Sequence, residues 1–436
     1  MWTAPGSHSA GWRMPEAPKG LAHKFKYAAD IARICEQGKM DALFFADSNV
    51  LRTTDLIERG DVAMERQHQP VRLEATSLIS ALSAVTTHLG FIATATTTYN
   101  EPFNVARRFA TIDQISEGRG GWNLVTSQHE SEAPNYGYED HLEHDERYRR
   151  AEEFFDVCAG LWDCWAEDAL VEVKASARYS DITKFHVLNH RGKYFNVKGP
   201  LNIPRSPQGR PIIAQAGASG PGRDLAARIA DLVFLATSTL EDSKAFGDDV
   251  RARAERMGRA PTDFKMMPGL LPIVGRTEAE AKERYLELQS LITDEQALMA
   301  IRRLGGGLDL SKFPLDGPLP ELPKTNGAQA RQQILINMAR EQNLTLREVG
   351  RRFAESVGHN LIWGTPQYIA DMMEEWFRKG ACDGFCILFP YYKGGVEDFV
   401  TLVIPELQRR GLFRTEYEGT TLRQNLGLPL PKSRYS

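Results

Sequence analysis

The sequence predicts an α/β fold built on parallel strands, and within that class it favours a (βα)8 barrel. Short apolar runs alternate with amphipathic segments along the 436 residues. Most of these runs are continuously apolar, as expected for strands that helices cover on both faces. No GxGxxG pattern follows a run, which argues against the alternative, a doubly wound dinucleotide-binding sheet. The predicted strands are residues 42–46, 89–98, 121–126, 211–217, 231–237, 266–274 and 384–390.

Two segments between these strands carry clear helix signals. The first runs from Tyr148 to Trp165, with apolar residues at the three- and four-residue spacing of one helix face. The second covers residues 366–379, where Thr365 is a candidate N-cap and Pro366 takes the first helical position.

A closed barrel needs an eighth strand, and we expect it only ahead of His8. Too few residues precede His8 for a full strand, so the first strand is expected to be truncated or to begin upstream of Met1. Because a barrel cannot leave two neighbouring edges unpaired, residues 1–7 should run extended into the seam. Trp2 should then be buried, with Pro5 at the end of the stub.

We predict one domain over residues 1–436, with insertions at about 166–210 and 275–363. The first insertion reads as a small hairpin with an extended approach to the next strand. The second carries a charged helix, a GGG turn and a proline-rich turn, and is a candidate lid. Neither insertion has enough apolar residues for a core of its own.

The composition indicates which partners and which cellular compartment to expect. A net charge of −4 offers no electrostatic case for nucleic acid or an anionic membrane. No apolar run reaches the length of a membrane span, about 20 residues. The five cysteines form no CxxC pair, which is typical of a reducing cytoplasm. Cys382 and Cys386 lie in or beside an apolar run, where cysteine acts as a small hydrophobe.

Polar residues stand where the predicted strands end, and in a barrel these ends meet at one rim. The AGASGPG turn precedes a helix and offers free backbone N–H groups that suit a phosphate, although a plain strand-to-helix turn would read the same. The residues at the predicted rim are Asp47, Thr94, Asn123, Thr126, Ser219 and Gly220.

His144 and Tyr148 are four residues apart and face the same way on the predicted helix, so they could contact an aromatic ligand. A capping histidine and a half-buried tyrosine are the plainer reading. Together with His144, His129 and His141 raise the further possibility of a metal site. The HExxH pattern is absent, and the nearby carboxylates read as a solvated surface, so we expect no metal.

The chain resembles the flavin-dependent monooxygenases of the bacterial-luciferase-like superfamily. Within it, the similarity is to the group of nitrilotriacetate monooxygenase component A, EDTA monooxygenase and dibenzothiophene sulfone monooxygenase. The most specific matches are GWNLVTS and FRTEYEGTTLR. The full set is GWRMP (11–15), FFADS (44–48), TATTTYNEPFNVARRFATIDQIS (94–116), GRGGWNLVTS (118–127), HLEHDERYRRAEEF (141–154), GPLNIPRSPQG (199–209), QAGASGPG (215–222), IWGTPQYIAD (362–371) and PELQRRGLFRTEYEGTTLR (405–423).

The resemblance implies a (βα)8 barrel of the luciferase-like type that binds reduced FMN (FMNH2). A separate NAD(P)H:flavin reductase would supply the FMNH2. By resemblance, the flavin contacts fall on Asp47, Thr94, His144, Tyr148 and Ser219, and His8 and Trp12 line the substrate side as candidate catalytic residues.

The activity that the resemblance implies runs through O2 and a C4a-hydroperoxyflavin. A small organic substrate would be hydroxylated next to nitrogen or sulfur, and the C–N or C–S bond would then break. Two alternatives remain open, a deazaflavin-dependent oxidoreductase of the same superfamily and a non-catalytic flavin-binding protein. We also expect a cytoplasmic homo-oligomer, either a dimer or a tetramer, without a nucleic-acid or membrane partner.

Overall fold

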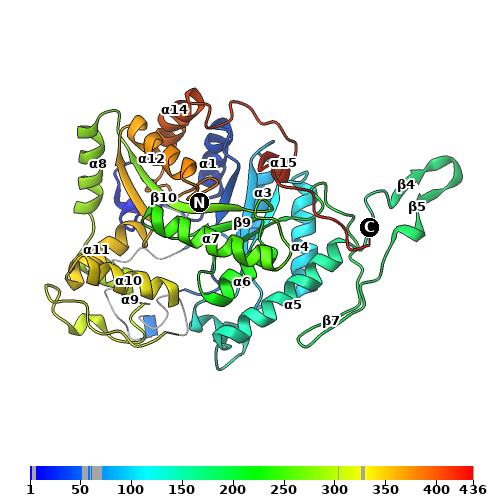
Figure 1. The fold of residues 1–436 in the computed structure, drawn as a ribbon, viewed down its shortest axis with the longest axis horizontal. Helices are drawn as coiled ribbons and strands as arrows, with labels where there is room; N and C mark the ends of the chain where they lie inside the picture. Colours follow the sequence, from blue (N-terminus) through cyan, green and yellow to red (C-terminus); the bar gives the residue numbers. More distant parts are fainter. Residues whose placement is uncertain are drawn as a thin grey trace.

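A curved parallel sheet flanked by helices forms the body of the molecule (Figure 1). The computed structural model describes residues 1, 6–51, 57–58, 60, 71–302, 304–325 and 329–435. Every residue of the second strand is buried, which confirms that continuous apolar runs mark strands covered on both faces. The strands of the barrel wall, in sheet order, are β1 (Ala42–Phe45), β2 (Gly90–Thr96), β3 (Gly120–Val125), β8 (Ile212–Gln215), β9 (Leu232–Leu235), β10 (Lys265–Val274) and β12 (Cys386–Ile387).

Helices follow these strands in the alternating order that a βα barrel requires. In α5, Tyr148, Ala151, Phe155, Cys158 and Trp162 are buried, as the apolar stripe predicts. The helices around the wall are α1 (Phe25–Gln37), α3 (Ala75–Ser83), α4 (Pro102–Ile115), α5 (His144–Trp162), α6 (Gly220–Ile229), α7 (Leu240–Arg256), α8 (Glu278–Ser290), α12 (Pro366–Arg378), α13 (Gly394–Asp398), the π-helical turn η7 (Phe399–Val403) and α14 (Ile404–Arg409).

The start of α12 confirms the predicted cap. Thr365 is the N-cap residue, its hydroxyl accepts from the Tyr368 amide at 3.3 Å, and Pro366 is the first helical residue.

Strand β11 (Asn360–Gly364) is one that the sequence analysis missed. It pairs with the carboxyl-terminal half of β10, residues 270–274, and it lies at the end of a segment that we assigned to an insertion. The run NLIWG is short and directly precedes the strong helix start at Thr365, so helix signals dominated that stretch. The predicted closing strand ahead of His8 falls largely on residues 2–5, including Trp2 and Pro5, which lie outside the described residues, so it stays a prediction.

Strand β11 nevertheless does not close the barrel. The Lys265 amide donates to the Asp231 carbonyl, next to β9, at 3.0 Å. The Gly275 amide donates to the Gly364 carbonyl of β11 at 3.1 Å. The Leu270 carbonyl accepts from Leu388, beyond β12, at 2.7 Å. Because successive backbone groups of a strand point to opposite edges, β9 and β11 share one edge of β10 and β12 takes the other. The described wall therefore has a seam between β12 and β1.

The two insertions differ in how they fold. The first forms two small hairpins that project from the body, β4 (Leu170–Val173) with β5 (Arg178–Ser180) and β6 (His190–Arg191) with β7 (Asn196–Val197) (Figure 1). The second contains α9 (Asp294–Arg302), α10 (Gln329–Glu341) and α11 (Leu346–Ser356), which pack around a cluster separate from the barrel core. The expectation that this insertion has no core was wrong, because its leucines and Phe353 gather only when the three helices fold together.

The C-terminal segment seals the barrel at the amino ends of the strands. Leu422 of α15 (Leu422–Asn425) and Leu428 belong to the cluster that fills the lumen beside Phe44 and Ile92. A Cβ on Gly90 would lie 2.7 Å from Leu422 Cδ1, so a larger residue at this position would displace the Leu422 side chain. No helix within the described ranges is long and apolar enough to cross a membrane.

Candidate active site

Asn123 and Thr94 face the barrel lumen near its carboxyl rim. Side chains alternate along a strand, so Trp122 and Leu124 point outward to the helices while Asn123 points inward. Asn123 Nδ2 donates to Thr94 Oγ1 at 2.7 Å, and Thr94 donates to the Phe45 carbonyl at 2.9 Å. Asn123 is 4% exposed, and its Oδ1 atom has no hydrogen-bond partner among the described residues. A buried acceptor of this kind suits a ligand that brings a donor.

Asp47 follows β1 and lies at the same rim. Its carboxylate accepts from the amides of Ser48 (2.8 Å) and Ala75 (3.1 Å), which ties the end of β1 to the start of α3. Burial raises the pKa of Asp47, while these two hydrogen bonds and the nearby Arg72 act in the opposite direction. The side chain is thus held in place by backbone donors.

The turn from β8 into α6 forms an open cradle. Ser219 is the N-cap of α6 and accepts from the Gly222 amide at 3.3 Å. A Cβ built on Gly220 would meet nothing within 4 Å, whereas one on Gly217 would lie 2.6 Å from Tyr148 Oη. The first turn of α6 therefore offers backbone N–H groups beside open space, which is the arrangement that binds phosphate at a helix N-terminus.

Tyr148 brings α5 to this cradle. The side chains of Ser219 and Thr126 lie close enough to its hydroxyl to lower the pKa of Tyr148, so residues that follow β3 and β8 meet at this phenol. Burial raises the pKa of Tyr148, so it is a neutral hydrogen-bonding group near pH 7. The ring of His144 lies 5.0 Å from the Tyr148 ring, and its Nδ1 atom lies 2.8 Å from Asp145 Oδ1.

The two residues expected on the substrate side differ in burial. His8 is 1% exposed, its amide donates to the Pro390 carbonyl beyond β12 (3.2 Å), and its Nδ1 accepts from the Ala10 amide (3.2 Å). His8 Nε2 is buried with no protein partner among the described residues, and burial lowers its pKa to about 4. Trp12 lies in the short turn η1 (Gly11–Arg13) and is 42% exposed.

The sequence analysis missed His359, which precedes β11. Its Nε2 lies 2.8 Å from Arg331 Nη2, its ring centroid lies 5.2 Å from that of Phe234, and its Nδ1 is a buried atom without a described partner. Burial and the Arg331 charge keep its pKa well below the usual value. A lone histidine inside a long insertion carries no local signal, so only the fold reveals that it lies beside β10.

A second polar group lies next to β2 and β3. Ser127 donates to Glu132 at 2.8 Å and lies 2.8 Å from the Thr96 hydroxyl. Nearby, His141 contacts both Tyr99 and Arg147. Burial, reinforced by the Arg147 charge, lowers the pKa of His141 to about 4, so the imidazole is neutral.

The histidines considered as metal ligands have other contacts. His144 lies against Asp145 and His141 against Tyr99, and the described part of the chain holds no group of three or more His, Cys, Asp or Glu side chains placed to bind a metal ion. The predicted rim residues, in contrast, lie in two adjoining groups. In one, Asn123 and Thr94 are hydrogen-bonded to each other, and Thr94 also bonds the end of β1, which Asp47 follows. The other lies around the turn from β8 into α6 and consists of Thr126, His144, Tyr148, Ser219 and Gly220.

Comparison with known proteins places this arrangement in a family. The family model described as "Luciferase-like monooxygenase" matches residues 4–383. Nitrilotriacetate monooxygenase component A of Aminobacter aminovorans is 47% identical over 431 residues, which cover 98% of this chain and 95% of that protein. N-acetyl-S-(2-succino)cysteine monooxygenase of Bacillus subtilis (strain 168) is 45% identical, with coverage of 99% and 96%.

A solved structure agrees with both relatives. The EDTA monooxygenase from Chelativorans sp. BNC1 superposes with a TM-score of 0.77 at 31% identity, covering 98% of this chain and 97% of that one. A riboflavin lyase solved with modified FMN has a TM-score of 0.85 at 31% identity, covering 98% of this chain and 94% of that one. From the matched family, the identities and the barrel fold together, the chain belongs to the luciferase-like monooxygenases.

Proposed function

We propose that this chain is the oxygenase component of a two-component monooxygenase that uses reduced FMN and O2. One oxygen atom enters a C–H bond next to nitrogen or sulfur of a small organic substrate, and the other leaves as water. The hydroxylated product then breaks its C–N or C–S bond. The observation that carries this proposal is the buried Asn123 Oδ1 without a described partner, one rim position away from the α6 cradle.

The α6 cradle suits the FMN phosphate. The amides of the first turn and the Ser219 hydroxyl would donate to its oxygens, and the positive end of the helix favours the anion. Gly217 leaves room beside Tyr148, whose hydroxyl would turn from Ser219 and Thr126 toward the ligand with little movement. His144 would cover the sugar phosphate from the start of α5.

The lumen-facing pair suits the flavin ring. Asn123 Oδ1 would accept from a ring N–H, while Thr94 holds the amide in that orientation from the opposite side. When bound, reduced FMN supplies the electrons that activate O2. The chain's part is to hold the ring, to keep water away and to place the substrate beside it.

His8 and His359 are the groups that we place on the substrate side, with Trp12 at its edge. Both imidazoles are neutral near pH 7 because burial lowers their pKa values. In each ring one nitrogen already accepts a hydrogen bond, from Ala10 or from Arg331, so the nitrogen without a described partner carries the proton and could donate a hydrogen bond to substrate. The bundle of α9–α11 packs on the segment that carries His8, since the Ser9 amide donates to Ala354 of α11 at 3.0 Å. This bundle is therefore the candidate lid.

The direct test couples the purified chain to a flavin reductase, NADH, FMN and O2. Three substrates make a discriminating panel: nitrilotriacetate, EDTA and N-acetyl-S-(2-succino)cysteine, which the relatives' names contain. We expect oxygen uptake and product, scored by mass, only when the reductase is present, and we expect extensive chelation of metals to leave turnover intact. Turnover by the isolated chain with NADH alone, or anaerobic reduction of substrate by a deazaflavin, would overturn the proposal.

A second test addresses the phosphate site. Ser219→Leu should weaken FMN binding by about 1–3 kcal/mol and should leave the already weak riboflavin binding unchanged. Thr239→Leu is a matched control, because Thr239 caps α7 in the same way, accepting from the Asp242 amide at 3.1 Å. Equal losses for FMN and riboflavin would place the phosphate elsewhere.

A further inference from the structure

The turn between α11 and β11 holds its backbone in an uncommon conformation. Val357 has a φ of 53° and Gly358 a φ of 77°, so two successive residues lie in the left-handed region. A β-branched residue such as valine rarely adopts this conformation, and strained backbone of this kind gathers at functional sites. The His359 amide donates to the Ser356 carbonyl at 3.1 Å and closes the turn. The turn thereby directs the His359 side chain toward β10.

Strand β10 leaves room for this side chain at Gly269. Met266 packs against α6 and α7 outside the barrel and Met267 against the apolar cluster of the lumen, so alternation along the strand turns Gly269 toward the lumen. A Cβ on Gly269 would lie 2.3 Å from His359 Nδ1, so the imidazole occupies the space of the absent side chain. The Phe234 ring packs beside it, with 5.2 Å between the ring centroids. His359 therefore enters the lumen and is only 5% exposed.

Arg331 of α10 binds both the imidazole ring and the turn. Its Nη2 atom lies 2.8 Å from His359 Nε2, and its Nη1 atom donates to the Val357 carbonyl. Burial and the Arg331 charge keep the pKa of His359 well below its usual value, so the ring is neutral. Because a guanidinium group can only donate, Nε2 is the acceptor and the neutral ring carries its proton on Nδ1. This buried N–H group has no hydrogen-bond partner among the described residues.

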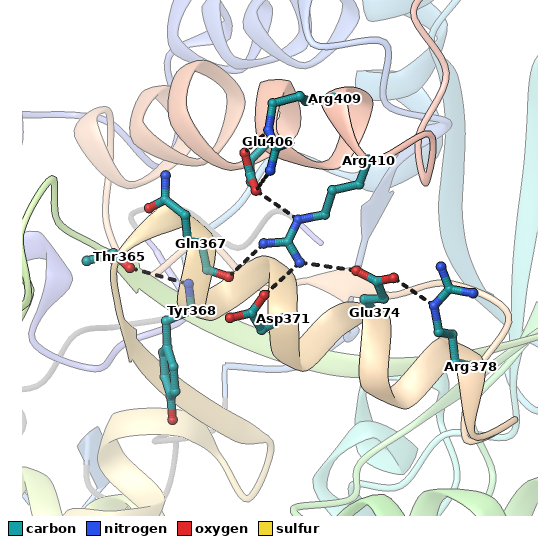
Figure 2. Close-up of polar contacts among 9 residues, drawn as sticks. All are labelled: Thr365, Gln367, Tyr368, Asp371, Glu374, Arg378, Glu406, Arg409 and Arg410. Carbon is teal, nitrogen blue, oxygen red and sulfur yellow. Dashed lines mark hydrogen bonds and ion pairs between the residues drawn. The ribbon is translucent and has the colours of Figure 1, made fainter.

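Strand β11, which follows the turn, is a rigid support. It pairs along its whole length with β10. At its end Thr365 caps α12 and accepts from the Tyr368 amide at 3.3 Å (Figure 2). Arg410, which follows α14, donates to Asp371 of α12 at 2.7 Å and fixes that helix in turn. Because the barrel side is held in this way, Arg331 on the α9–α11 bundle is the partner that would move if the bundle opened.

We propose that Arg331 is a positioning residue that makes His359 a hydrogen-bond donor to a carboxylate oxygen of the substrate. A positive charge directly behind the ring strengthens the donor and favours an acceptor with negative charge. Closure of the α9–α11 bundle brings Arg331 to Nε2 and fixes the Nδ1–H tautomer, so the carboxylate is recognised in the closed state. This inference rests on the proposed function, and it adds the substrate class and the residue that the candidate lid contributes.

The first experiment reads the tautomer of His359 directly. Nitrogen-15 NMR of the full chain with FMN, labelled at histidine, should show the Nδ1–H form of His359, identified by the loss of its signals in His359→Asn. Arg331→Met should release the ring, so that the Nε2–H form becomes a major species. Arg259→Met is the matched control and should leave the His359 signals unchanged, because Arg259 also donates to two backbone carbonyls, those of Ala227 (3.0 Å) and Ala230 (2.6 Å).

The second experiment measures recognition of the carboxylate. Calorimetric titration of the same protein uses nitrilotriacetate and N-acetyl-S-(2-succino)cysteine, each as the carboxylate and as the full methyl ester. We expect the tighter-binding acid to bind at least about tenfold more tightly than its ester. His359→Leu should weaken binding of the acid about tenfold and that of the ester less than about threefold. His359→Asn keeps an N–H group near the Nδ1 position and should retain most of the preference.

The proposal is overturned by an Nε2–H form in the wild type, by a tautomer that Arg331→Met does not change, by equal losses of acid and ester in His359→Leu, or by binding of neither acid. The wild-type spectrum does not depend on whether His359→Leu folds. Product formation with the reductase judges the proposed function separately. A chain that binds the acid as described but yields no product fails the proposed function alone, whereas product formation with an acid preference that His359→Leu leaves intact fails this inference alone.

Discussion

The two ends of the barrel differ in how far their buried polar atoms are hydrogen-bonded. At the amino ends of the strands, Gln208 Nε2 donates to Asp113 (2.8 Å) and to the Gly120 carbonyl (2.8 Å), and Arg423 holds Asp231 with two bonds of 2.8 and 2.9 Å. At the carboxyl rim, three buried polar atoms have no described hydrogen-bond partner: Asn123 Oδ1, His8 Nε2 and His359 Nδ1. The difference indicates that the first end is built for stability and the rim for a ligand.

Two buried arginine nitrogens at the amino end also lack a described hydrogen-bond partner, but each belongs to a guanidinium group that lies over an aromatic ring. Arg210 Nε and Arg414 Nη1 also lack described hydrogen-bond partners there. Both belong to guanidinium groups that lie over aromatic rings, Arg210 at 5.5 Å from Phe155 and Arg414 at 5.7 Å from Tyr417. A ring face stabilises a guanidinium cation but offers no hydrogen bond to an amide oxygen, so the unpartnered Asn123 oxygen at the rim has no such compensation.

Breaking the amino-end pair should have the largest effect. Arg423→Ala leaves Asp231 buried without its cation, and we expect a loss of about 3–5 kcal/mol in the free energy of unfolding. The control is Arg33→Ala, which removes an exposed ion pair with Asp30 (3.6 Å) and should cost less than about 1 kcal/mol. Urea unfolding measures both, and similar losses for the two variants would contradict the assignment of the amino end to stability.

The pH dependence of stability should separate the two ends by sign. Burial raises the pKa of Asp113 to about 6, against hydrogen bonds from Ser206, Gly120 and Gln208. The folded state then holds this proton more tightly than the unfolded state, so the contribution of Asp113 falls by about 3 kcal/mol as pH rises from about 4 to 6. Asp113→Asn should remove that decline.

His8 should show the reverse slope. Burial lowers its pKa to about 4, so the folded state binds the proton less tightly than the unfolded state, where the pKa is about 6.5. Its contribution is fully present above pH 6.5 and is lost, by about 3 kcal/mol, as pH falls to 4. His8→Gln should flatten this acid-side loss. Unfolding midpoints of Asp113→Asn and His8→Gln, measured between pH 4 and 7, test both predictions. If the two substitutions changed the pH dependence of stability with the same sign, the predictions would be wrong.

Two buried amides offer a sharper comparison. Gln208→Leu should destabilise the protein by about 1–3 kcal/mol, since it leaves Asp113 and the Gly120 carbonyl with fewer partners, and it should not change flavin affinity. Asn123→Leu should do the opposite, with little loss of stability and weaker binding of reduced FMN. Thermal unfolding and flavin titration of both variants test the pair. Equal stability losses would show that Asn123 is a structural amide.

The smallest effect is expected from Tyr148→Phe. The hydroxyl contacts Ser219 and Thr126 side chains that also have other neighbours, so we expect about 0.5–1.5 kcal/mol in FMN binding and less in unfolding. The measurement is FMN titration with riboflavin as the reference ligand. A loss confined to folding would indicate that the phenol only joins α5 to α6.

Local patterns in the sequence were sufficient for most of the wall and its helices. Continuous apolar runs located all seven strands of the wall, and Thr365–Pro366 located the start of α12, because strand burial and helix capping are decided by neighbouring residues. The ends of parallel strands necessarily meet at one rim, so polar residues after those strands, such as Asp47 and Ser219, could be proposed as a site without coordinates.

The tertiary structure alone decided what distant segments do to each other. His359 lies beside Phe234 because β11 pairs with β10, a contact that no local pattern contains. The core of α9–α11, the Arg423–Asp231 pair and the seam between β1 and β12 likewise join residues separated by tens to hundreds of positions. Side-chain type and periodicity determine which surfaces a segment must bury, whereas only the folded chain determines which partner buries them and which polar atoms are left for a ligand.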